Sequence, residues 1–184
     1  MQITTKTNYL DFLCSVNVFK LKEKDIETIF KNIKDRPLIK EFDKNFEELI
    51  FGQLCDLQQM ETMEDLFLKP FKIILDMDRK VLMKHKAVDC LRFVLYVKEW
   101  LEKITKLFKS IEYKPSGEEI QAGIKSLNHG FFGTADWYAR RMGIADHEEV
   151  FQTNWMRIYS TLKIDHENNR FEKNYRKVID KKRK

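Results

Sequence analysis

The sequence predicts an all-α protein, mainly an irregular bundle of helices around a long central helix, with a short β element at the N-terminus left open. Three observations predict this class. Glycine and proline number only 6 and 3 in 184 residues, whereas sheet-rich folds need more turn residues. Hydrophobic residues make up 43% of the chain, which is enough for a packed core. Apolar residues also recur at helical spacing along most of the chain.

The first elements are a mixed segment and a helix. Residues 1–20 are rich in Thr, Val, Phe and Tyr, and they suit a strand, a hairpin or a short helix around Tyr9–Cys14. Over residues 22–34, apolar side chains repeat at i, i+3, i+4 and i+7, so a helix is predicted there. It should end at Arg36-Pro37, because the residue before proline avoids helical geometry.

The next segment contains two expected breaks. Residues 38–50 have helical spacing but remain ambiguous, and Phe51-Gly52-Gln53 should change the chain direction before a short helix over 54–59. Thr62 is placed to cap a further helix, with Asp65 favouring its positive end. Pro70 should lie in the first turns of that helix.

Residues 76–78 are polar and predict a turn, and a short helix should cover 79–85. Residues 87–111 carry the strongest helical pattern, with a broad apolar face and lysines and glutamates around the opposite side. A helix of this length spans about 37 Å. We expect it to be the central helix against which the others pack.

The last third predicts four helices. Ser116-Gly-Glu-Glu119 is a capping box, and its helix should run to 128–130. A second helix is expected after Gly133-Thr134, closed by Gly143. A third begins at the acidic stretch 146–149. The fourth is a basic helix or tail over 170–184, so the expected organisation is a helical domain over 1–169 with a basic end.

The charge is concentrated at that end. Residues 170–184 contain eight basic and two acidic residues, a net charge of +6, and the other residues contain 26 basic and 27 acidic residues, a net charge of −1. The basic residues form a candidate surface for nucleic acid or for an acidic partner. They are Arg170, Lys173, Arg176, Lys177, Lys181, Lys182, Arg183 and Lys184. The alternative is a frayed, solubilising C-terminus.

No catalytic, metal-binding or cofactor motif is present. The chain has no glycine-rich phosphate loop, no GxSxG sequence and no HExxH sequence. Its three cysteines are far apart, and no two of its four histidines lie at i, i+4, so we expect no zinc site, no disulfide and a reducing compartment. The sequence therefore predicts a non-enzymatic protein without a cofactor.

No signal for a membrane appears either. The N-terminus lacks the charged-then-apolar pattern of a signal peptide, and no apolar run approaches the roughly 20 residues of a membrane span. We expect a soluble, cytosolic chain. The pattern gives no indication of oligomeric state.

The most unusual stretch places two arginines beside two pairs of aromatic residues. Aromatic and arginine side chains are enriched at protein interfaces, and together they can also stack on bases and pair with phosphates. The third interpretation is that the aromatics belong to the core and the arginines are solvated. The candidate partner-binding residues are Phe131, Phe132, Trp137, Tyr138, Arg140 and Arg141.

Two segments resemble a known group of proteins. Glu48-Leu-Ile-Phe51-Gly52-Gln53-Leu-Cys-Asp56-Leu57 resembles the FGQ…DL segment near the start of some tailed-bacteriophage tail assembly chaperones and related small virion-module proteins. Ala139-Arg-Arg-Met142-Gly143-Ile144, followed by Glu148-Glu-Val150, Trp155 and Ile158, is similar to a C-terminal pattern in such proteins. The resemblance covers residues 45–180.

The resemblance implies a phage-encoded, non-enzymatic protein that binds other virion proteins. Such a protein would act in the cytoplasm of the bacterial host during assembly, as a chaperone or connector, or remain packaged in the virion. The basic C-terminus departs from many chaperones of this kind, which are acidic. That departure leaves nucleic-acid binding through the C-terminus as the alternative function.

Overall fold

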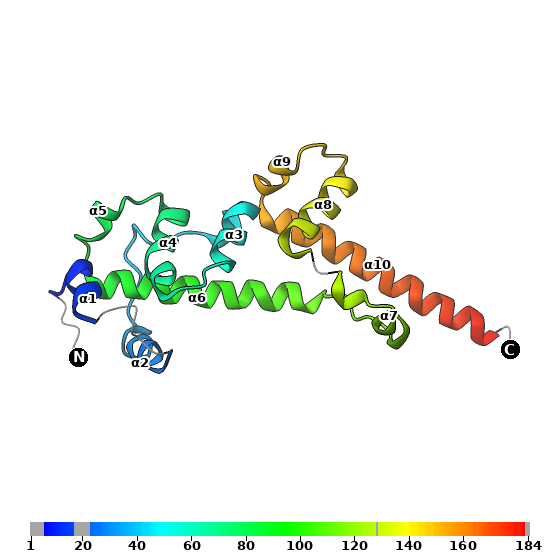
Figure 1. Cartoon of the computed structure of the whole chain (residues 1–184), viewed down its shortest axis with the longest axis horizontal. Helices are drawn as coiled ribbons and strands as arrows, with labels where there is room; N and C mark the ends of the chain where they lie inside the picture. Colours follow the sequence, from blue (N-terminus) through cyan, green and yellow to red (C-terminus); the bar gives the residue numbers. More distant parts are fainter. Residues whose placement is uncertain (1–5, 17–22, 128, 183–184) are drawn as a thin grey trace. The chain divides into compact units, whose positions relative to one another are not determined.

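The computed structural model describes residues 6–16, 23–127 and 129–182. Over these residues the chain forms α-helices and short 3-10 helices and no β-strand, which confirms the predicted all-α class (Figure 1). The elements are α1 (Tyr9–Val16), α2 (Glu23–Ile33), η2 (Phe46–Glu48), α3 (Phe51–Gln58), α4 (Met63–Leu75), α5 (Arg79–Leu82), α6 (Ala87–Ser110), α7 (Gly117–Gln121), η3 (Ile124–Ser126), α8 (Gly130–Met142), α9 (His147–Phe151) and α10 (Trp155–Lys182).

The chain divides into two compact units. The first unit comprises Met1–Leu49 and Gln53–Ile104, and the second comprises Ile50–Gly52 and Thr105–Lys184. The division falls inside two helices, α3 and α6. The predicted organisation placed a boundary at 169/170, and there α10 continues without a break.

The first unit is built around a cluster of aromatic rings in tilted and edge contacts. The ring centroids of Phe71 and Phe93 lie 4.9 Å apart, and Phe42 lies 5.3 Å from Phe93 and 5.6 Å from Phe71. Tyr9 of α1 adds a ring 5.7 Å from Phe71. All four side chains are fully buried. Because aromatic rings bury large areas and favour tilted and edge contacts, this cluster forms the centre of the unit's core.

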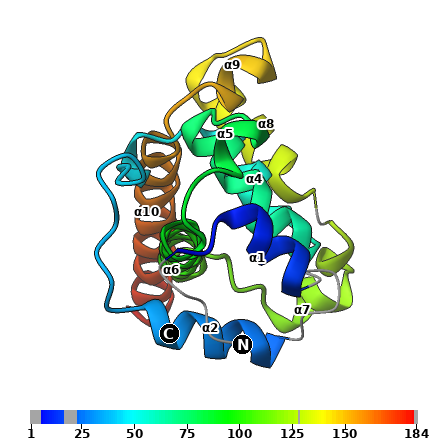
Figure 2. The ribbon, with the colours of Figure 1, turned by 90° about the vertical axis from the view of Figure 1, so that its left-hand side faces the viewer.

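Helix α6 is the central helix of the first unit, as predicted. Figures 1 and 2 show α4 and α2 on different sides of its first half. Consequently the first half is buried on more than one face, whereas the sequence pattern identified a single face. The buried residues of the whole helix are Ala87, Val88, Cys90, Leu91, Phe93, Val94, Leu95, Val97 and Ile104.

Helix α4 begins at the predicted cap but carries its proline elsewhere. The Asp65 N–H donates to the Thr62 Oγ1 at 3.1 Å, which satisfies one of the free amides at the helix start. Pro70 is in the middle of the helix and is buried, so its expected place in the first turns is wrong. The turn over 76–78 is confirmed, because Asp76 ends α4 in a left-handed conformation with a φ of 48°.

The structure decides between the alternatives that the sequence left open in two segments before α6. Residues 9–16 form α1, which confirms the alternative of a short helix around Tyr9–Cys14, and an isolated bridge pairs Asn8 with Lys86. Residues 1–5 and 17–22 of the predicted N-terminal segment lie outside the described residues. The ambiguous segment 38–50 contains only the 3-10 helix η2.

The second unit packs around Trp155 and a short piece of α3. The centroid of the Phe51 ring lies 5.8 Å from that of Phe151 and 6.3 Å from that of Phe131. The backbone N–H of Phe51 donates to the Thr153 carbonyl oxygen at 2.8 Å. Gly52 lies in the first turn of α3 rather than at a break, and a Cβ there would lie 3.2 Å from the Phe151 carbonyl oxygen. Glycine there allows the close approach of α3 to Phe151 and does not form a turn.

The capping predictions in the second unit are confirmed, and the predicted helix lengths are not. Ser116 and Glu119 form the reciprocal capping box of α7. That helix ends at Gln121, followed only by η3. Helix α8 starts at Gly130, before the expected Gly133, and Gly143 closes it in the left-handed conformation with a φ of 70°.

Candidate interaction surfaces

The six predicted partner-binding residues divide between core and surface. All six lie on α8, in the second unit. Tyr138 is 2% exposed and packs with Ala135 and Ala139 in the core, so its side chain is not available to a partner. Phe131 and Trp137 are half-buried. Phe132, with 57% of its surface exposed, and the two arginines face solvent.

The exposed members of this α8 cluster are already engaged within the unit. Arg140 Nε lies 3.0 Å from Asp136 Oδ2, and Arg141 Nε lies 3.4 Å from Asp165 Oδ2. His147 Nε2 lies 3.3 Å from the other oxygen of Asp136. The hydrogen bond from His147, followed by that from Arg140, lowers the pKa of the Asp136 carboxyl. The Phe132 ring stacks on His147 with centroids 4.9 Å apart.

Helix α10 presents a different surface in its second half. Its buried residues, Trp155, Ile158 and Tyr159, are all in the first turns. From Glu167 to Lys182 every residue is exposed except the half-buried Ile179. Figure 1 shows this red-orange half extending away from α8 and α9. The second half therefore lacks the tertiary packing that usually stabilises a helix.

Four large apolar residues lie on one face of this exposed helix. Phe171, Tyr175, Val178 and Ile164 have between 51% and 69% of their surface exposed. Ile164, Phe171 and Val178 follow one another at seven-residue intervals, and Tyr175 lies four residues after Phe171, so they share one face. The Phe171 and Tyr175 rings stack at 6.1 Å. We refer to these four residues as the apolar stripe.

A row of cations borders the apolar stripe on one side. Lys163, Arg170 and Lys177 each come one residue before a member of the stripe, which places them about 100° around the helix. Lys181 continues the row four residues after Lys177. None of these four side chains, which we refer to as the basic flank, forms an ion pair among the residues that the structure describes.

The opposite side of the stripe is already neutralised. Asp165 and Glu172 each come one residue after a member of the stripe. Asp165 pairs with Arg141, and Glu172 Oε2 lies 3.6 Å from Arg176 Nη2. The second half of α10 therefore combines an exposed apolar stripe with one edge that carries the four cations of the basic flank and a single carboxylate, Glu167.

The structure divides the predicted basic residues between the basic flank, an ion pair and other exposed positions. Arg170, Lys177 and Lys181 belong to the basic flank, Arg176 is paired, and Lys173 and Lys182 are exposed outside the flank. Arg183 and Lys184 lie outside the described residues. Lys163 and Ile164 are not among the predicted residues, because the predicted domain boundary follows them in the chain. The seven-residue spacing of 164, 171 and 178 was the signal that could have included them.

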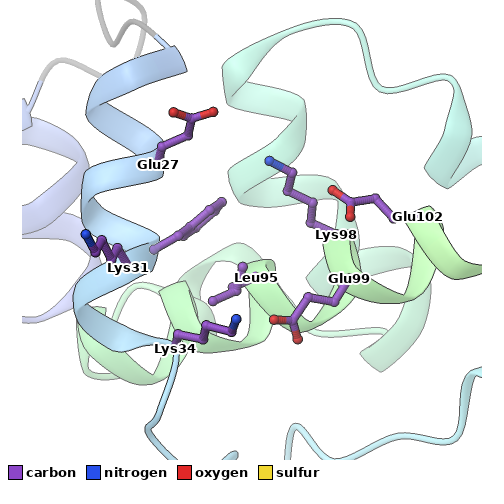
Figure 3. Close-up of a pocket in the computed structure, with 8 residues that line it drawn as sticks. Glu27, Lys31, Lys34, Leu95, Lys98, Glu99 and Glu102 are labelled. Carbon is purple, nitrogen blue, oxygen red and sulfur yellow. The ribbon is translucent and has the colours of Figure 1, made fainter.

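The first unit contains an open pocket of about 360 Å³ between α2 and α6 (Figure 3). Phe30 and Leu95 are its buried apolar residues, and Lys98 Nζ lies 5.9 Å from the centre of the Phe30 ring. The rim carries three lysines and three glutamates, so its charges balance. The rim residues are Glu27, Lys31, Lys34, Lys98, Glu99 and Glu102.

Among the described residues, no group of three or more His, Cys, Asp or Glu side chains is arranged to hold a metal ion. Within the same ranges, no helix has the length and apolar character needed to cross a bilayer. Comparisons with protein-family models, with curated protein sequences and with solved structures found no match to this chain.

Proposed function

We propose that this chain is a non-enzymatic interaction protein that binds another macromolecule through the second half of α10. The observation that supports this proposal is the exposed apolar stripe beside the unpaired basic flank. A contiguous apolar face on a helix with no tertiary cover is typical of a binding surface. An isolated helix of this length is also marginal in water, so a partner would stabilise it.

The proposed setting is the assembly of a bacteriophage virion. It rests on the resemblance of residues 45–180 to tail assembly chaperones and related virion-module proteins. The partners would be other virion proteins, met in the host cytoplasm, and the chain would act as a chaperone, a connector or a packaged component. The exposed part of the α8 cluster would be a second, smaller contact.

Site-specific photo-crosslinking in the organism that encodes the chain tests this proposal. A photoreactive amino acid at Phe171 should give a covalent adduct with a virion protein, identified by mass spectrometry. The control position is Lys173, which is also exposed on α10 but points away from the stripe. Adducts with a virion protein at position 171 and not at 173 support the proposal. No adduct at 171, or equal adducts at both positions, contradicts it.

The alternative function is nucleic-acid binding through the basic C-terminal segment. The net charge of +6 over residues 170–184 favours it. Phe171 and Tyr175 could also stack on bases. A chain truncated after Asn169 should then lose DNA and RNA binding, and the binding of the full chain should fall steeply with salt. Equal binding by the truncated and full chains eliminates this alternative.

A further inference from the structure

The two edges of the apolar stripe differ in charge, and this difference indicates which charges a partner should carry. We propose that the stripe binds an acidic amphipathic helix of another protein. Its apolar side chains would cover Ile164, Phe171, Tyr175 and Val178, and its carboxylates would lie along the basic flank. This inference rests on the proposed function and adds the chemistry of the partner.

The dimensions of the stripe fit a helix. From Ile164 to Val178 it is about 21 Å long at 1.5 Å per residue. Its seven-residue repeat presents apolar side chains every two turns, as in the seam between two paired helices. A partner helix of about four turns, with apolar residues at i, i+3 or i+4, and i+7, would cover its full length.

The charges specify acidic residues on the partner. Lys163, Arg170, Lys177 and Lys181 have no ion pair among the described residues, so an approaching helix can neutralise them along its edge. Complementary charges at the edge of an apolar contact increase the association rate and select the partner. Along the other edge Asp165 and Glu172 already have arginine partners, so cations on the partner would gain little there.

A second copy of the chain fits this surface less well. Residues 170–182 carry six basic and two acidic residues, a net charge of +4, and two such helices would repel each other. In a parallel pair the basic flank would face Asp165 and Glu172, which are already paired. Nucleic acid is also disfavoured, because it offers no aliphatic surface to cover the exposed side chains of Ile164 and Val178.

The test uses the full chain and a fluorescent synthetic peptide of about 20 residues, long enough to cover the stripe. The peptide has leucine at heptad positions a and d and glutamate at positions e and g. Two matched peptides replace either the glutamates with lysine or the leucines with glutamine. Binding is measured by fluorescence anisotropy, with single-stranded and duplex DNA of similar length as competing probes.

We expect only the acidic, leucine-containing peptide to bind tightly. Arg170→Glu with Lys177→Glu should weaken its binding about tenfold or more, because two attractions become repulsions. Lys40→Glu with Lys44→Glu makes the same change in net charge at two exposed lysines of the first unit, off the stripe, and should weaken binding by less than about threefold. Phe171→Gln with Tyr175→Gln should remove most of the binding.

Three outcomes would overturn the inference: tighter binding of the lysine peptide, tighter binding of DNA, or equal losses in the two charge-reversed variants. Sedimentation velocity adds a fourth, since a stable dimer of the chain alone would show that a second copy covers the stripe. If no peptide binds while crosslinking at position 171 still captures a virion protein, this inference fails and the proposed function stands. If crosslinking also fails, both fail.

Discussion

The buried hydroxyl of Tyr9 forms a hydrogen bond that links α1 to the core of the first unit. Its hydroxyl donates to the Phe67 carbonyl of α4 at 2.7 Å, and its side chain has no exposed surface. Burial, and to a smaller extent the charge of Cys90, raises the pKa of Tyr9 well above its ordinary value of 10.0. The neutral hydroxyl is therefore a requirement of the folded state.

This requirement predicts a loss of stability at high pH. The folded pKa of Tyr9 lies above the unfolded value, so the unfolded state binds fewer protons once the pH exceeds about 10, and the free energy of unfolding falls as pH rises. Denaturant titrations between about pH 9 and pH 12 should show this decline. Tyr9→Phe should reduce the slope and cost about 1 kcal/mol at neutral pH, since it removes a hydrogen bond. An unchanged slope in Tyr9→Phe would contradict the assignment.

The three cysteines should differ strongly in reactivity. Cys14 is exposed, whereas Cys55 and Cys90 are buried. Burial raises the pKa of Cys55 to about 12 and raises that of Cys90 well above its ordinary value. We expect a maleimide at pH 7 to label Cys14 rapidly and the other two only after denaturation, as mass spectrometry of peptides would show. Rapid labelling of Cys90 in the native chain would show that the core of the first unit is open.

At the scale of elements, the Thr62 cap of α4 should contribute measurably to the stability of the first unit. Thr62→Ala removes the acceptor for the Asp65 amide and should destabilise the first unit by about 1 kcal/mol. Thr28→Ala in α2 is the matched control, because that hydroxyl donates to the Lys24 carbonyl inside a helix and caps nothing. Denaturant midpoints of the two variants provide the measurement. Equal losses would mean that the Thr62 cap makes no special contribution.

The predictions that succeeded concern chemistry within four residues. The Thr62 cap, the Ser116 capping box and the left-handed Gly143 were predictable because capping depends on near neighbours. The errors at Gly52 and Pro70 have another cause. Gly52 lies close to Phe151, far along the chain, and the helix around Pro70 is held by tertiary packing.

The candidate surfaces show the same limit. Sequence marked the aromatic residues of α8, but the face that packs is the one with Ala135, Tyr138 and Ala139, and which face becomes core depends on the rest of the unit. On α10 the apolar side of the basic segment was predictable from Phe171, Tyr175 and Val178. What could not be predicted was that no described residue of the second unit covers it.

At the scale of the whole molecule, the uneven charge predicts how binding depends on salt. The basic flank supplies four cations. If these cations neutralised DNA phosphates, the binding constant would fall as salt rises. A plot of its logarithm against the logarithm of the salt concentration would have a slope between about −3 and −4. An acidic helix has no condensed counterions to release, so its slope should be much shallower. The slope is measured by titrating the chain with the acidic peptide at salt concentrations from about 0.05 to 0.5 M. A slope as steep as that for DNA would contradict a contribution of the apolar stripe to peptide binding.

Hydrogen–deuterium exchange of the full chain, free and saturated with the acidic peptide, tests the account most directly. In the free chain, amides from 167 to 182 should exchange much faster than those of the buried start of α10 around Trp155 and Ile158, because nearly all of residues 167–182 are exposed. The peptide should slow exchange over 164–182 and leave the first unit unchanged. Equal protection of both halves of α10 in the free chain, or protection by the peptide that maps to another element, would contradict the account.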